Sequence, residues 1–204
     1  MSDEQRPDPQ AMRDPQAIRA LSHPLRLRLL ELLGTRERTT ATDCAAVTGE
    51  SVASCSFHLR QLEKYGFAER VPASGRERPW RLTSITQNLD RESLDEEGRR
   101  ASEAFETAFV DWELGRLRER STRPAPAGWE GTQNSSGSTT WMTREELVEL
   151  NRELGELLTR YVGRIDGSQP RPPDGRWVRV FAATTVITDL DPATHPDAGP
   201  DARP

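Results

Sequence analysis

Apolar residues in the first third of the chain recur at helical spacing in short stretches, and most stretches follow a residue that commonly caps a helix. Asp14 and His23 each stand directly before a proline, the residue favoured at the first position of a helix. The second stretch is rich in leucine and stops at Gly34, a residue typical of helix C-termini. Thr40 or Thr42 caps the third stretch. The spacing predicts four successive helices, beginning near residues 14, 24, 40 and 51.

The hydrophobic pattern changes after Gly66. Residues 67–71 and 79–83 favour β-strands, and a glycine-containing turn separates them. Helices followed by a β-hairpin are the layout of a winged helix-turn-helix, in which the second helix of the pair enters the DNA major groove and the hairpin rests on the flanking backbone. The expected fold class is therefore mainly α, with one small antiparallel sheet.

The chain after the hairpin reads as a second, helical region. A strongly charged helix is predicted from about Leu89 to Arg120, followed by an irregular connection. Thr143 opens another helix with a capping-box pattern, and its apolar positions continue to Tyr161. Residues 177–187 are predicted to form a terminal strand. The expected organisation is a disordered tail, a winged helix-turn-helix domain, a helical region and a second disordered tail, over residues 1–13, 14–88, 89–188 and 189–204.

The fourth predicted helix carries two different faces. Gly49 makes the turn before it, and its apolar residues fall partly at helical spacing. Another face carries short polar side chains, which let a helix lie close to a surface such as the major groove. The segment is therefore predicted to be a recognition helix. Its apolar residues are Phe57, Leu59, Leu62 and Tyr65, and its polar face carries Ser51, Ser54, His58 and Gln61.

The net charge of -5 argues against a nucleic-acid ligand, but the distribution of charge along the chain argues for one. Residues 15–87 carry a net charge of +4, and the remainder of the chain carries -9. A basic half joined to an acidic half fits a DNA-reading domain with a separate assembly or sensing domain. No apolar run approaches the length of a membrane span and the N-terminus is polar, so a soluble, cytoplasmic protein is expected.

Several motifs together resemble a known family. Residues 20–33, the turn at 49–51, the segment Ser56-Phe-His-Leu-Arg-Gln-Leu62 and the arginine-rich hairpin resemble ArsR-type winged helix-turn-helix transcriptional regulators. The resemblance covers about residues 15–84. The remainder resembles the C-terminal region of an actinobacterial subgroup of these regulators.

The resemblance implies a homodimer that binds an imperfect palindrome in double-stranded DNA, most simply as a repressor. Val52 departs from the polar residue found in many members, so the family's base preference is not transferred. The residues at the family's DNA-contacting positions are Ser51, Ala53, Ser54, Ser56, Phe57, His58 and Arg60 in the helix, with Arg76, Arg78 and Arg81 in the wing.

The sequence gives little indication of a metal site, a cofactor site or a catalytic site. The three histidines do not form a cluster with the spacing of a zinc site, and the third helix carries a single cysteine where the family's thiolate site would lie. We therefore expect no metal, no cofactor and no enzymatic activity. Cys44 and Cys55 should both point inward, either as small core residues or as an oxidisable pair that makes the protein a thiol-based regulator.

Each of the two predicted helices of the C-terminal region carries a stripe of apolar residues, and two interpretations of these stripes are possible. They form either a dimer interface or the core of this region, and an apolar pocket for a small-molecule effector between them, near Trp129, Trp141 and Trp177, is a further hypothesis. An alternative function is a protein-interaction module that has no operator of its own. The residues expected at the dimer interface are Phe105, Phe109, Trp112, Leu150, Leu154 and Leu157.

Overall fold

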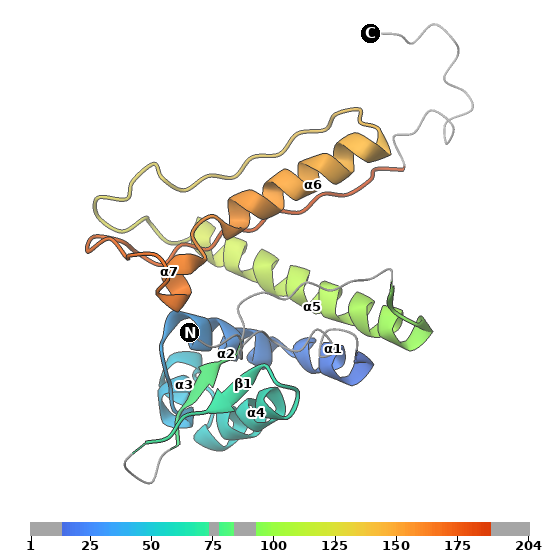
Figure 1. Cartoon of the computed structure of the whole chain (residues 1–204). Helices are drawn as coiled ribbons and strands as arrows, with labels where there is room; N and C mark the ends of the chain where they lie inside the picture. The colour runs from blue at the N-terminus through green and yellow to red at the C-terminus, as the bar shows by residue number, and fades with distance from the viewer. Residues whose placement is uncertain (1–13, 74–77, 84–92, 189–204) are drawn as a thin grey trace, which may run out of the picture. The chain divides into compact units, whose positions relative to one another are not determined.

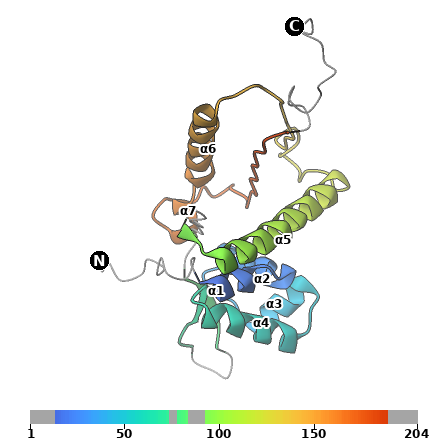
Figure 2. The same ribbon diagram turned by 90° about the vertical axis from the view of Figure 1, so that its right-hand side faces the viewer.

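The computed structural model describes residues 14–73, 78–83 and 93–188 (Figures 1 and 2). The chain divides into two compact units, one formed by the residues up to Ser136 together with Val162–Pro173, and the other by Gly137–Tyr161 together with the chain from Asp174 onward. Both predicted disordered tails and the predicted domain boundary at residue 88 lie outside the described residues.

The first unit begins with four helices, as the sequence predicts. Each starts where a side chain accepts a hydrogen bond from a backbone N–H of the first turn, which satisfies one of the donors left unpaired at a helix start. The capping residues are Asp14, His23, Thr40 and Ser51. The helices are α1 (Pro15–Leu21), α2 (Pro24–Thr35), α3 (Ala41–Thr48) and α4 (Val52–Lys64).

The predicted role of Gly34 as the end of α2 is wrong. The helix continues through Gly34 to Thr35, and the chain leaves it at Arg36 in extended backbone, with φ of -131° and ψ of 141°. This exit carries Thr39 to the hairpin, so no left-handed residue is needed at the end of the helix. A β-carbon on Gly34 would lie 3.7 Å from Leu82, an ordinary van der Waals contact.

The predicted hairpin is present as strands β1 (Ala68–Arg70) and β2 (Trp80–Leu82). They pair antiparallel, with Glu69 opposite Arg81. Thr39, in the loop between α2 and α3, adds a bridge to the sheet, because its backbone exchanges two hydrogen bonds with Trp80 at 2.8 and 2.9 Å. Four helices with this anchored hairpin form a winged helix-turn-helix, which confirms the predicted fold class.

The core of this domain lies where α2, α4 and the hairpin meet. Most of it consists of leucines that are almost completely inaccessible to solvent, and Cys44 and Cys55 are both 0% exposed. Trp80 is buried in the same cluster and ties the hairpin to the helices. Burial of these apolar side chains is the main favourable term that holds α4 in place.

Helix α5 (Glu96–Ser121) packs against α1 and α2. It begins at Glu96, later than predicted, because Asp95 caps it by accepting from Gly98 N–H. Arg116 of α5 pairs with Glu31 of α2 at 2.6 Å. The first unit also contains α7 (Gly163–Asp166), one short turn of helix that the sequence pattern does not predict.

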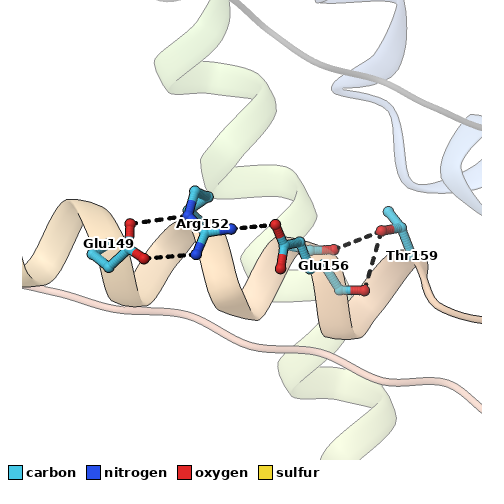
Figure 3. Close-up of polar contacts among 5 residues, drawn as sticks. Glu149, Arg152, Glu156 and Thr159 are labelled. Atoms are coloured by element: carbon cyan, nitrogen blue, oxygen red, sulfur yellow. Dashed lines mark hydrogen bonds and ion pairs between the residues drawn. The ribbon is translucent and has the colours of Figure 1, made fainter.

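The second unit contains α6 (Arg144–Thr159), which Thr143 and Glu146 open with the predicted capping box. Arg152 bridges Glu149 and Glu156 on the surface of this helix (Figure 3), and its Nη2 lies 2.6 Å from Glu149 Oε1. No residue of α6 is buried.

The predicted terminal strand over residues 177–187 is wrong. The segment is neither helix nor strand, since no other described segment forms a hydrogen-bonded ladder with it. A β-strand is defined by its partner, and apolar alternation alone does not supply one. Thr184 Oγ1 donates a hydrogen bond to Asn151 of α6 at 2.8 Å. In the described part of the chain, no helix has both the length and the apolar character needed to cross a bilayer.

Candidate nucleic-acid interface

The turn between α3 and α4 is closed by backbone geometry. Gly49 adopts a left-handed conformation with φ of 78°, which a glycine adopts without steric cost, and its N–H donates to Ala45 O at 3.0 Å. Arg28 of α2 donates to Val47 O at 2.9 Å, at the end of α3. These contacts close the end of α3 and tie it to α2, directly before the chain turns into α4.

Helix α4 has one buried face and one exposed face. Cys55, Leu59 and Leu62 point into the core. On the opposite side an outer stripe of exposed residues runs along the helix at four-, three- and four-residue steps, as expected for one face of an α-helix. The outer stripe consists of Ala53, Phe57, Arg60 and Lys64. Three of these residues were predicted to contact DNA, and Lys64 was not, although its spacing from Phe57 and Arg60 could have revealed it.

The predicted serine contacts occupy different positions around α4. Ser51 is the N-cap, and its hydroxyl oxygen accepts from Ser54 N–H at 3.0 Å. Ser54 and Ser56 are half-buried on the flanks of the helix. Ser56 is thus beside the outer stripe, whereas Ser51 has a structural role of its own.

His58 points toward α2 and away from the outer stripe. Its ring lies 4.3 Å from the ring of His23, centroid to centroid. His23 in turn caps α2, because its Nδ1 accepts from Leu25 N–H at 3.2 Å. Burial lowers the pKa of both rings, and the neighbouring Arg26 lowers it further. The sequence draws attention to both histidines separately. It does not indicate that their rings lie in contact, one at the start of α2 and the other on α4.

The hairpin is held against α4 by Glu63. Its Oε2 accepts hydrogen bonds from Arg70 Nε at 3.2 Å and from Trp80 Nε1 at 3.5 Å. The Arg70 guanidinium also lies over the Trp80 ring, 4.7 Å from the centroid. Charge and ring contacts therefore fix the wing close to the recognition helix.

The predicted wing arginines have separate environments. Arg81 pairs with Glu69 on the facing strand at 2.5 Å, so part of its charge is offset within the hairpin. Arg78 is exposed at the start of the second half of the hairpin. Arg76 lies outside the described residues.

Cys44 of α3 and Cys55 of α4 both lie in the core, on the side away from the exposed face of α4. Burial raises the pKa of the Cys44 thiol to about 11, which keeps it protonated near neutral pH. Thr48 Oγ1 lies 3.6 Å from Cys55 Sγ. Among the described residues, no group of three or more histidine, cysteine or acidic side chains is placed to hold a metal ion.

The residues predicted at a dimer interface belong to both units. Phe105 packs against the core of its own chain. Phe109 lies between Phe105 and Trp112, with ring centroids 5.9 and 6.3 Å away, and both Phe109 and Trp112 are half-buried. On α6, Leu150 and Leu154 are half-buried and Leu157 is 52% exposed.

The three tryptophans that were expected near an effector pocket differ in exposure. Trp141 is 84% exposed, Trp177 is 54% exposed, and Trp129 is half-buried. Trp141 and Trp177 therefore present much of their surface to solvent.

Comparison with known proteins agrees with this geometry. The model of a family described as a helix-turn-helix domain matches residues 21–71, which span α2, α3, α4 and β1. No curated protein matches the chain. The matched domain supports DNA binding and transcription regulation, and points to a regulator rather than an enzyme.

Proposed function

We propose that this chain is a homodimeric transcriptional repressor of the ArsR type that binds an imperfect palindrome through α4 and the hairpin. The observation that carries the proposal is the outer stripe of α4, which is exposed along its whole length and flanked by a wing that Glu63 holds in place. The major groove is about 12 Å wide and admits a helix of this kind.

Electrostatics supports DNA as the ligand of this face. Arg60 and Lys64 occupy the C-terminal half of the outer stripe, and Arg78 is exposed on the hairpin. In a chain with net charge -5, exposed cations on α4 and on the hairpin favour a polyanionic ligand. Contacts with phosphates supply most of the affinity of such a complex and position the helix for reading bases.

Dimerisation is the second part of the proposal. The resemblance to ArsR-type regulators implies two copies. Leu157 and Leu158, which are exposed at the end of α6, support it, because exposed apolar surface is typical of an interface. Two copies related by a two-fold axis would place their recognition helices about one helical turn of DNA apart, roughly 34 Å. That spacing is the geometric reason for a palindromic site.

Selection of duplexes from a randomised DNA library by the full-length protein tests this proposal. We expect the selected sequences to contain two inverted half-sites whose centres lie about ten base pairs, or a multiple of that, apart. Sedimentation of the free protein should give twice the mass of the chain. Enrichment of a single half-site, or of no sequence, would contradict the proposal.

Transcription measured in vitro separates a repressor from an activator. A promoter that overlaps the selected palindrome should produce less transcript as the protein is added. A promoter with one scrambled half-site should respond far less, because a dimer loses one of its two recognition contacts. A rise in transcript would leave DNA binding intact but overturn the assignment as a repressor.

A further inference from the structure

The N-terminal half of the recognition helix presents apolar side chains to the outside. Phe57 is 49% exposed and Val52 is 47% exposed, and Ala53 lies between them on the exposed side. In helix-turn-helix complexes this half of the recognition helix contacts the edges of bases. An exposed phenylalanine on a helix that is otherwise well packed has apolar surface to contribute to a ligand.

Most of the hydrogen-bonding groups in the same half of the helix are occupied or turned away. The hydroxyl of Ser51 caps the helix, and Ser54 is half-buried. His58 stacks on His23 and faces α2. Ser56, like Ser54, is half-buried on a flank of the helix.

The Phe57 ring is held in place by its neighbours. It meets the His58 ring edge to face, at 5.1 Å between centroids and 84° between planes. His58 is in turn supported by His23 at the start of α2. A ring that already rests against its neighbour on one side has less freedom to lose on binding, which lowers the entropic cost of contacting the groove.

The chemistry of the major groove gives such a surface a specific target. Every base pair presents hydrogen-bond donors and acceptors there, but the only apolar group is the C5-methyl of thymine. The cations Arg60 and Lys64 on the same stripe complement the phosphates on either side, which favours DNA over a protein partner as the occupant of this face.

We infer that Phe57, with Val52 and Ala53 beside it, reads thymine methyl groups in each half-site. This inference rests on the proposed function and extends it to base preference. Recognition is then dominated by apolar contact and shape, and the selected half-sites contain thymine at positions where the methyl group faces α4.

Replacement of thymine by uracil tests this inference, because uracil pairs identically and lacks only the methyl group. A duplex selected from the randomised library by the full-length protein is resynthesised with uracil at every half-site thymine, and both duplexes are titrated at one salt concentration by fluorescence anisotropy. We expect affinity to fall about fourfold for each contacted methyl group, or roughly 15-fold for one in each half-site.

Two variants separate Phe57 from the rest of the helix. Phe57→Ala should show a clearly smaller difference between the two duplexes, because the largest of the contacting side chains is gone and only Val52 and Ala53 remain. Lys64→Ala should bind both more weakly and keep the full difference between them. Both residues are exposed, and the circular dichroism and melting temperature of each variant check that it folds.

Each outcome decides a different point. Equal binding of the two duplexes by the unmodified protein, or a difference that is undiminished in Phe57→Ala, overturns the inference while DNA binding itself stands. Selected half-sites without thymine do the same. If the protein enriches no sequence at all, the proposed function fails and this inference fails with it.

Discussion

His23 is at once a helix cap and the support of a side chain on the recognition helix. Its Nδ1 accepts the Leu25 N–H, which is possible only for a neutral ring, because a protonated imidazole carries a hydrogen on both nitrogens. His58 Nδ1 is buried and has no hydrogen-bond partner among the described atoms. The groups that face this pair are Arg26 of α2, which disfavours protonation, and Glu50 of the turn, which favours it.

The fold should therefore lose stability in mild acid. The pKa of both rings is lowered in the folded protein, first by burial, so the unfolded chain binds protons more readily. The stabilisation is fully present above the ordinary histidine pKa of about 6.5 and is lost as the pH falls below it. Unfolding by urea between pH 5 and pH 8 measures this loss.

The variant His23→Asn provides the matched control for this prediction. Asparagine caps a helix as well as any residue and does not titrate in this range. Near pH 8 the variant should keep the cap and lose only the ring contact with His58, and it should lose less further stability between pH 7 and pH 5. An identical pH profile would show that His23 contributes nothing to the acid sensitivity.

The reactivity of the Cys44 thiol limits any role of the two cysteines as a redox sensor. Its pKa of about 11 leaves roughly one molecule in a thousand as thiolate at pH 8, and the thiolate is the reactive form. We expect iodoacetamide to label the native protein far more slowly than the protein in urea. Rapid labelling of the native state, or a disulfide formed under mild oxidation with altered DNA binding, would favour the thiol-based alternative.

At the scale of single elements, helix starts were the most predictable feature. The caps at Asp14, Thr40 and Thr143 follow from local chemistry, because the side chain and the N–H that it satisfies are two or three residues apart. The prediction of a strand at residues 177–187 is wrong because a strand depends on a distant segment and not on local chemistry. Its existence depends on a partner segment, and nothing in its own sequence specifies one.

The cap of α4 gives a prediction at the same scale. Ser51→Ala should lower the free energy of unfolding by about 1 kcal/mol, since Ser54 N–H loses its acceptor. Ser51→Asn should restore most of that stability, because asparagine accepts the same hydrogen bond. If Ser51→Ala weakens DNA binding and Ser51→Asn does not rescue it, the serine contacts DNA as well as capping the helix.

The sequence predicts part of the outer stripe of α4, but it does not predict the contacts around that stripe. Helical spacing places Phe57 and Arg60 on one side of α4, but only the fold shows that His58 faces inward, because its partner His23 is far away along the chain. The sequence also does not predict that Glu63 anchors the wing, since this contact joins side chains from α4, β1 and β2. Contacts between distant segments carry no local sequence signal.

At the scale of the whole molecule, the chain separates a DNA-reading domain from a mainly acidic remainder. Residues 15–87 carry +4 and the rest carries -9, so we expect the affinity for DNA to depend on exposed cations of the N-terminal domain such as Arg60, Lys64 and Arg78. Most of the negative charge lies outside that domain and opposes non-specific binding. Removing one of these cations should therefore have an effect that is large and strongly dependent on salt.

The salt dependence of DNA binding shows whether Arg60 and Arg78 contact phosphates. Affinity for the selected duplex is measured between 50 and 200 mM salt for the unmodified protein, Arg60→Ala, Arg78→Ala and the control Arg123→Ala, whose arginine is exposed just after α5. Each lost phosphate contact should reduce the slope of log K against log salt by about 0.9 per protomer. We expect weaker binding and a flatter slope for Arg60→Ala and Arg78→Ala and no change for the control. Unchanged slopes in both variants would show that α4 and the hairpin do not dock on DNA as proposed.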